Sequence, residues 1–383
     1  MKSSLLALTI ASLSLSACSS WFYGESNYPE PNELREVQSQ FNTQILWQKN
    51  LGDESGERGL RLSPASDGQH VYAVSADGYF YRFDKDSGKE IYRVDLRNDI
   101  SSGLTVAGNF AFLGTKNGDV MAIRLEDGQI MWRSRLSSVL LSRPAFGDGL
   151  LAVYASDGQL SVFNPADGAL IWRHHSKVPM LSMRGNASPI IGGGVVMLSD
   201  ENGALQVLDA RTGISIANDN LVQAGAASTV AAIIDQDASP KINNNRLFAS
   251  AYGKETYAVD LQSGAPLWRN ERAASGVDFA ISPTELYLST AEDHVVALDQ
   301  DTGNELWRNS DLVGRRLSPP LAIPGLVGVL DFEGYLTWLD SRNGNMIARS
   351  KIAASGSKSE ALILPDVIVW QLDNGGIVAL RPQ

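Results

Sequence analysis

Short stretches of alternating apolar and polar residues recur along the chain and are separated by Asp and Gly. In the fullest copy, residues 297–307 read ALDQDTGNELW, so that an apolar stretch ends at Asp299, Gly303 follows, and a second stretch carries Trp307. Alternation with a period of two is typical of a β-strand. An Asp side chain accepts hydrogen bonds from turn N–H groups, and Gly provides the positive φ that a reversal needs. The pattern therefore predicts a strand, a tight turn and a returning strand.

This phrase returns every ~40 residues, which is the period of a propeller or a solenoid. Its turn glycines are Gly88, Gly128, Gly168, Gly213, Gly264, Gly303 and Gly344. The returning strand carries, in the same order, Tyr92, Trp132, Trp172, Ala217, Trp268, Trp307 and Ala348. A large aromatic ring at a fixed place in each unit is expected to be buried against the next unit, with its indole N–H free to find one partner.

A second turn signal precedes each phrase and adds further strands to the unit. It consists of Gly78, Gly118, Gly158, Gly203, Gly334 and Gly375, with Asp293 standing in once and Gly253 displaced by one residue. Apolar stretches such as residues 150–155 lie ahead of this turn. Each unit of ~40 residues therefore predicts four short antiparallel strands, which is one propeller blade.

The two ends of the chain complete the count of units. The last unit stops at residue 383 and lacks an outer strand with Trp, whereas residues 45–48, which include Trp47, form an outer strand without a blade before it. Joining them closes a ring and pairs edges that would otherwise be exposed. The sequence predicts an all-β, eight-bladed β-propeller of four-stranded antiparallel blades. Seven blades remain the alternative if the degenerate unit around Ala217 is misread, and a solenoid or sandwich leaves the split unit unexplained.

The N-terminus carries an export signal rather than part of the fold. Lys2 gives a positive start, an apolar stretch follows, and residues 15–18 read LSAC. This sequence resembles the bacterial lipobox, in which the Cys is lipidated, so residues 1–17 are expected to be a lipoprotein signal peptide and Cys18 the lipidation site. Residues 18–40 are expected to be a flexible tether and residues 41–383 the propeller. Because Ser19 replaces the Asp that favours inner-membrane retention, the expected address is the periplasmic face of the outer membrane.

Composition and charge narrow the choice of partners. The net charge of −11 excludes a nucleic-acid binder and implies repulsion from anionic head groups, so membrane attachment is expected to rest on the lipid alone. No apolar stretch after the first twenty residues is long enough for a membrane-spanning helix.

The repeat also bears on whether the chain could be an enzyme. The repeat resembles that of quinone-dependent dehydrogenases, named after pyrroloquinoline quinone, and the resemblance implies a Ca²⁺ ion and often a disulfide between adjacent cysteines. Cys18 is the only cysteine, so such a disulfide is impossible here. The four histidines, His70, His174, His175 and His294, lack the spacing of a zinc motif. Neither a nucleophile elbow nor a phosphate-binding loop occurs. We therefore expect no catalytic site, no metal and no cofactor.

Places where the repeat lapses are the better candidates for function. After Trp172 the chain places Leu181, Met183 and Arg184 in a connection between blades, and apolar anchors beside a guanidinium suit a protein interface. The alternative is that Leu181 and Met183 face the core. In the stretched unit, Asp235 and Asp237 lie two apart on one face of an extended segment, where they could receive a basic partner or cap a turn.

The lipobox, the repeat and these two loops together resemble the BamB family, the propeller lipoproteins of the outer-membrane β-barrel assembly machinery. The resemblance covers essentially the whole chain. It implies a non-enzymatic scaffold whose partner is the barrel subunit BamA, bound through its POTRA domains by Leu181, Met183, Arg184, Asp235 and Asp237, with delivery of unfolded outer-membrane protein strands as part of the role. Met183 departs from the family Leu, a near-isosteric change. A periplasmic quinone-dependent dehydrogenase and a propeller with a ligand in its central channel remain the alternatives.

Overall fold

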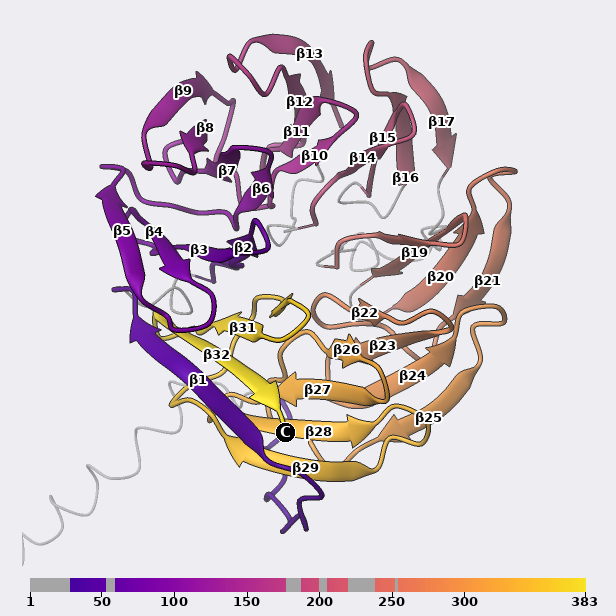
Figure 1. Ribbon diagram of the computed structural model, residues 1–383. Coiled ribbons are helices and arrows are strands. Elements are labelled where there is room, and N and C mark those ends of the chain that lie inside the picture. The colour runs from indigo at the N-terminus through magenta and orange to yellow at the C-terminus, as the bar shows by residue number, and fades with distance from the viewer. Residues whose placement is uncertain (1–27, 53–58, 177–186, 200–204, 220–237, 252–253) are drawn as a thin grey trace, which may run out of the picture.

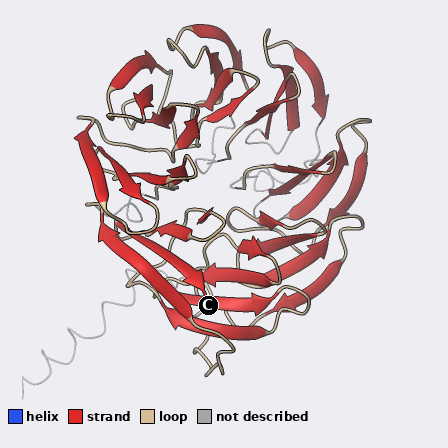
Figure 2. Ribbon diagram, viewed as in Figure 1, coloured by secondary structure: helices blue, strands red, loops and turns tan. Residues whose placement is uncertain are grey.

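The structure is a computed structural model that describes residues 28–52, 59–176, 187–199, 205–219, 238–251 and 254–383. Every regular element in these ranges is a strand (Figure 2). No helix that could span a membrane occurs in them. The strands form eight antiparallel sheets of four strands each, arranged as blades around a common axis (Figure 1). The predicted eight-bladed β-propeller is confirmed, and the unit around Ala217 is a blade of its own.

The first four blades follow one another along the chain. Blade 1 consists of β2 (Ala65–Ser66), β3 (His70–Val74), β4 (Tyr79–Asp84) and β5 (Glu90–Asp95); blade 2 of β6 (Thr105–Ala107), β7 (Phe110–Gly114), β8 (Asp119–Arg124) and β9 (Ile130–Arg135); blade 3 of β10 (Ala145–Gly147), β11 (Leu150–Tyr154), β12 (Gln159–Phe163) and β13 (Leu170–His175); and blade 4 of β14 (Ile190–Gly192), β15 (Val195–Ser199), β16 (Leu205–Asp209) and β17 (Ser215–Asp219).

The remaining blades bring the chain back to its start. Blade 5 consists of β18 (Lys241–Asn243), β19 (Arg246–Ala251), β20 (Glu255–Asp260) and β21 (Pro266–Asn270); blade 6 of β22 (Ala280–Ile281), β23 (Glu285–Ser289), β24 (Val295–Asp299) and β25 (Glu305–Asn309); blade 7 of β26 (Leu321–Ile323), β27 (Leu326–Leu330), β28 (Tyr335–Asp340) and β29 (Met346–Lys351); and blade 8 of β30 (Leu362–Ile363), β31 (Ile368–Gln371), β32 (Gly376–Pro382) and β1 (Thr43–Asn50).

Blade 8 closes the ring with strands from both ends of the chain. β1 pairs antiparallel with β32, with Thr43 opposite Pro382 and Asn50 opposite Gly376. Figure 1 shows this indigo strand on the outside of the yellow ones. An apolar cluster that includes Trp47, Val71 and Val369 joins blade 8 to blade 1. One such cluster lies at each of the eight blade boundaries, so the core is a ring of contacts between neighbouring blades.

The position of a strand within its blade determines which of its faces are buried, and therefore where its apolar residues lie. The third strands lie between two blades and are buried on both faces, as in β8, where Val120 to Ile123 are all fully buried. The fourth strands form the outer rim and alternate, so that Trp172 is buried in β13 while Ile171 is exposed. Apolar residues on both faces of the inner strands are explained by the neighbouring blades that cover them.

A β-bulge occurs in every blade beside the aromatic position of the outer strand. In blade 6, Ala297 lies opposite Trp307 but the next residue, Leu298, lies opposite Glu305, which leaves Leu306 as the extra residue. The same register shift occurs in the other seven blades. A bulge bends its strand and re-aims the neighbouring side chain. Here it leaves Leu306 exposed and Trp307 buried against blade 7.

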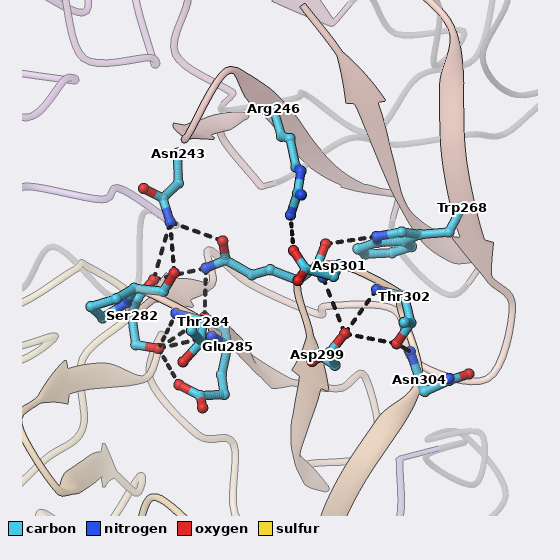
Figure 3. A network of polar contacts seen from close by, with 12 residues as sticks. Asn243, Arg246, Trp268, Ser282, Thr284, Glu285, Asp299, Asp301, Thr302 and Asn304 are labelled. Carbon is cyan, nitrogen blue, oxygen red and sulfur yellow. Dashed lines mark hydrogen bonds and ion pairs between the residues drawn. The ribbon is translucent and has the colours of Figure 1, made fainter.

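The turns have the geometry that the sequence predicts. Each of the seven repeat glycines has a positive φ, for example +70° at Gly303. In the same turn the Asp299 carboxylate accepts hydrogen bonds from the backbone N–H groups of Asp301 and Thr302 at 3.1 and 2.8 Å (Figure 3). At the second turn, Asp293 replaces Gly with a φ of +67°, a conformation that Asp tolerates better than most residues.

Residues 28–40, within the expected tether, lie against blades 6 and 7. The backbone N–H of Asn32 donates to the Val313 carbonyl at 2.9 Å, and Arg349 Nη1 donates to the Arg35 carbonyl at 2.7 Å. The Tyr28 hydroxyl donates to the Asp293 carboxylate. The chain therefore reaches β1 along a defined path across two blades.

Candidate functional site

The residues expected from the sequence to be functional lie outside the described ranges: Cys18, Leu181, Met183, Arg184, Asp235 and Asp237. The structure does describe the ends of the two loops that carry the last five. The first loop leaves blade 3 after Ser176 and returns at Ala187, and the second leaves blade 4 after β17 and returns at Ala238. Both are connections from an outer strand to the next innermost strand, so both begin and end on the same face of the propeller.

The returning ends of the two loops are joined to each other. The backbone N–H of Ser188 donates to the Ser239 hydroxyl at 3.1 Å, although the two residues lie 51 positions apart. The hydroxyl of Ser188 in turn accepts from the backbone N–H of Arg143 at 3.0 Å. The backbone N–H of Ser239 donates to the Asp278 carboxylate at 2.5 Å. These bonds link the entries to the innermost strands of blades 3, 4, 5 and 6.

Charged side chains from five blades meet beside these serines. We call Arg61, Arg143, Lys241, Asp278 and Glu360 the axial cluster. Lys241 Nζ forms an ion pair with Glu360 Oε1, and Arg143 Nη2 lies 3.7 Å from Glu360 Oε2. Arg61 Nη1 lies 4.0 Å from Asp278 Oδ2. Because the residues that meet at Glu360 come from blades 3, 5 and 8, which do not adjoin, the cluster lies at the propeller axis.

Burial and ion pairing oppose each other at the carboxylates of this cluster. Burial raises the pKa of Asp278, and the nearby Glu360 carboxylate raises it further, against the influence of Lys241 and Arg61. Burial also acts to raise the pKa of Glu360, but Lys241 and Arg143 outweigh it and hold that pKa below its usual value. The pKa of Lys241 is raised, because Glu360 and Asp278 outweigh the effect of its burial. The Lys241–Glu360 pair is therefore ionised at neutral pH.

A cavity of about 410 Å³ adjoins the axial cluster. It is lined mainly by the innermost strands of blades 1 to 4 and 8, with Pro64, Thr105, Phe146 and Leu362 as walls and Arg143 and Ser188 as polar groups. A mainly apolar lining with a few hydrogen-bonding groups is suited to holding a ligand or a polypeptide side chain. Arg143 and Ser188 connect this cavity to the ends of the two loops.

The described ranges contain no group of three or more His, Cys, Asp or Glu residues that could hold a metal ion. His174 and His175 occupy consecutive positions of β13, opposite Leu160 and Gln159, and so lie on opposite faces of the strand. Burial and the nearby Arg308 lower the pKa of His294.

The axial cluster is the feature of the site that the sequence interpretation missed. Its signal is visible in retrospect as a Ser or Arg before Pro at the entry to an innermost strand, at residues 63–64, 143–144, 188–189 and 239–240. Lys241 follows the last of these directly, where other blades have an apolar residue such as Ile190. Strand periodicity does not reveal that the five charged residues of the axial cluster converge, because convergence is a property of the closed ring.

Comparisons with known proteins agree with this architecture. A family model described as outer membrane protein assembly factor BamB matches residues 37–109, 76–309 and 254–383. The chain is 30% identical over 390 residues to the outer membrane protein assembly factor BamB of Yersinia pestis, covering 99% of each chain. It is 31% identical over 386 residues to that of Escherichia coli strain K12, covering 98% of this chain and 97% of the relative.

Among solved structures, BamB from Moraxella catarrhalis matches with a TM-score of 0.79 and 22% identity, covering 89% of this chain and 100% of that one. A quinohemoprotein alcohol dehydrogenase from Pseudomonas putida matches with a TM-score of 0.69 and 10% identity, covering 92% of this chain and 78% of that one. At these identities both likenesses show the fold alone.

Proposed function

The chain belongs to the family of the outer membrane protein assembly factor BamB, and we propose that it acts as a non-enzymatic scaffold in outer-membrane protein assembly. In this role it binds the POTRA domains of the barrel subunit BamA and assists the delivery and insertion of outer-membrane protein strands. Its contact residues are Leu181, Met183 and Arg184 on one loop with Asp235 and Asp237 on the other.

The hydrogen bond between Ser188 and Ser239 is the observation that carries the contact site. It fixes the returning ends of the two loops side by side, and both loops belong to one face of the propeller. Apolar anchors beside an Arg on one loop and two carboxylates on the other then offer a single surface of mixed character. Such a surface combines desolvated anchors, which give affinity, with charges that orient the partner.

A binding experiment with purified POTRA domains tests this surface. We expect Leu181→Asp and Arg184→Ala each to weaken binding about 30-fold or more, because the loss of an interface anchor costs about 2 kcal/mol. Asp235→Asn with Asp237→Asn should mainly slow association and reduce its dependence on salt. Leu170→Asp and Arg173→Ala, exposed on β13 of the same blade, are matched controls that should bind normally. If the loop variants bind as well as the unaltered protein, the proposed contact residues are wrong. If the unaltered protein does not bind, the proposed function is wrong.

Attachment through a lipid on Cys18, with the propeller on the periplasmic side of the outer membrane, completes the proposal. Several acyl chains hold a protein stably on a membrane that it does not span. Cys18→Ser should move the protein from the outer-membrane fraction to the soluble periplasmic fraction, whereas Ser19→Ala should not. Retention of the Cys18→Ser protein in the membrane fraction would contradict lipid anchoring.

A further inference from the structure

An aromatic ring from the preceding blade covers the outer turn at six of the seven repeat glycines. The rings of Trp47, Trp132, Trp172, Trp268 and Trp307 lie against Gly88, Gly168, Gly213, Gly303 and Gly344, respectively. Each indole Nε1 donates to a backbone carbonyl of the same turn at 2.8–2.9 Å, those of Lys85, Pro165, Ala210, Gln300 and Ser341. Figure 3 shows Trp268 in this position beside the turn of blade 6.

Blade 2 keeps the same arrangement with a different aromatic residue. The Tyr92 ring lies against Gly128, and its hydroxyl donates to the Leu125 carbonyl at 2.7 Å. Leu125 occupies the place of Lys85 and Gln300 in their turns. The turn therefore accepts either Trp or Tyr, provided that the ring brings a hydrogen-bond donor.

At the seventh turn, in blade 5, no described residue takes the place of this ring. Gly264 has the same φ of +70°, but no described residue lies within 4 Å of the position that a Cβ would take. It is exposed, whereas Gly88, Gly128 and Gly303 are buried. The Leu261 carbonyl, which corresponds to the acceptor in the other turns, accepts no side-chain hydrogen bond within the described ranges.

The vacancy results from one residue of blade 4. Ala217 lies opposite Val207 in the register, the place that Trp172 holds opposite Val162 in blade 3. Val162 is fully buried, but Val207 is only half-buried, as expected if no ring covers it. Residues 218–237, which follow Ala217, contain no aromatic residue that could take its place.

Two exposed apolar residues precede Ala217 in blade 4, one in the turn and one on the edge strand. Ile214 is 67% exposed and Ile216, on β17, is 59% exposed, the two highest values among the large apolar residues of the described ranges. β17 is the outermost strand of its sheet. An edge strand can pair with an extended polypeptide through its backbone groups, while side chains at alternate positions fill adjoining pockets.

We propose that the notch formed by Val207, Leu261 and Gly264, with Ile214 and Ile216 at its rim, binds a Trp or Tyr side chain of an extended segment of a partner protein. The ring lies flat on Gly264, and its N–H or O–H donates to the Leu261 carbonyl. The apolar side chains beside it contact Ile214 and Ile216. The partner thereby supplies the ring that the repeat supplies at the other six turns. This site does not depend on the two loops of the proposed function, whose strand connections belong to the opposite ends of the blades.

A pentapeptide, acetyl-Thr-Val-Trp-Val-Thr-amide with 5-fluorotryptophan, is a suitable probe, and ¹⁹F NMR reports its binding without interference from the eight tryptophans of the protein. The protein is the mature chain with Cys18→Ser. We expect a saturable change of the fluorine signal. Ala217→Trp, which fills the notch from within, should weaken binding at least about tenfold. Gly264→Asn should do the same, since Asn tolerates the positive φ and projects into the notch.

Two controls distinguish binding at this site from nonspecific binding. Ile91→Trp adds the same ring to an exposed position of β5 and should leave binding unchanged. A peptide with Ala in place of Trp should not bind. The proposal is overturned if the unaltered protein does not bind the probe, if both notch variants bind it normally, or if the Ala peptide binds equally well. Dimerisation that Ala217→Trp abolishes would show that the occupant is a second copy instead of a partner protein.

Discussion

The indole Nε1 of Trp307 donates a 2.8 Å hydrogen bond to the carbonyl oxygen of Ser341, in the outer turn of the following blade. The same ring lies against Gly344 of that turn and is 8% exposed. One side chain thus joins blade 6 to blade 7 by apolar contact and by a directed hydrogen bond. Because the ring closes on itself, each such contact supports the position of every other blade.

Loss of this ring should destabilise the propeller strongly. We expect Trp307→Ala to lower the free energy of unfolding by about 3–5 kcal/mol, because the change leaves a large cavity at the blade boundary and removes the hydrogen bond to Ser341. Urea unfolding followed by circular dichroism measures it. Leu306→Ala, at the neighbouring position that is 51% exposed, is the control and should change stability by less than about 0.5 kcal/mol.

Two glycines with the same φ of +70° separate backbone strain from ring contact. A Cβ at Gly344 would overlap the Trp307 ring, whereas a Cβ at Gly264 meets no described residue. Gly264→Ala should therefore cost only the strain of a left-handed Ala, about 1–2 kcal/mol. Gly344→Ala should cost a further 1–3 kcal/mol because of the overlap. If urea unfolding showed that both variants lose the same free energy of unfolding, the contact with the Trp307 ring would not be a reason for glycine at residue 344.

The axial cluster should stabilise the protein at neutral pH, and this contribution should be lost in acid. Although burial opposes it, Lys241 and Arg143 lower the pKa of Glu360 in the folded protein. The ionised carboxylate therefore adds stability above its unfolded pKa of about 4.3, and this contribution is lost as pH falls through the lower folded pKa. Glu360→Gln should cost about 2 kcal/mol at pH 7 and clearly less at pH 3. Glu90→Gln, exposed on β5, should cost little at either pH.

The contribution of Asp293 to stability should depend on pH in the opposite direction to that of Glu360. Burial raises its pKa in the folded protein, although the Tyr28 hydroxyl and two backbone N–H groups act to lower it. A raised folded pKa means that the contribution to stability is present below the unfolded pKa of about 3.9 and is lost as pH rises through the folded value. Asp293→Asn, which keeps the φ of +67° accessible, should therefore gain stability relative to the unaltered protein between pH 3 and pH 7. A difference that stays constant with pH would contradict the raised pKa.

Much of the fold was predictable because the same local pattern of strands and turns occurs in every repeat. Each turn glycine, the Asp that accepts from the turn N–H groups, and the split of blade 8 between Trp47 and residues 376–382 follow from local chemistry. Two relationships were not predictable. The repeat explains the glycine by the positive φ of the turn and the Trp by burial against the next unit. Only the structure shows that each ring lies on the glycine of the next blade. Nor did the sequence show that the Tyr92 hydroxyl reaches the Leu125 carbonyl, the acceptor position that a Trp indole reaches in other blades.

For the candidate site, the sequence identified two loops by their departure from the repeat, and Leu181, Met183, Arg184, Asp235 and Asp237 stay predictions. It did not reveal that Ser188 and Ser239, at the ends of these loops, are hydrogen-bonded. Nor did it reveal that Lys241 and Glu360 meet at the axis. Residues this far apart in the chain have no shared local pattern.

The sequence by itself determined the strands, the turns, the number of blades and the way in which the ring closes, because these depend on residues within one repeat and on the count of repeats. Tertiary structure decided which side chains of different blades meet: each ring with the glycine of the next blade, and five charged residues at the axis. It also decided that Gly264 is the repeat glycine that no described ring covers. Such contacts depend on the curvature of the closed ring. That curvature is set jointly by all eight blade boundaries, and no single stretch of sequence encodes it.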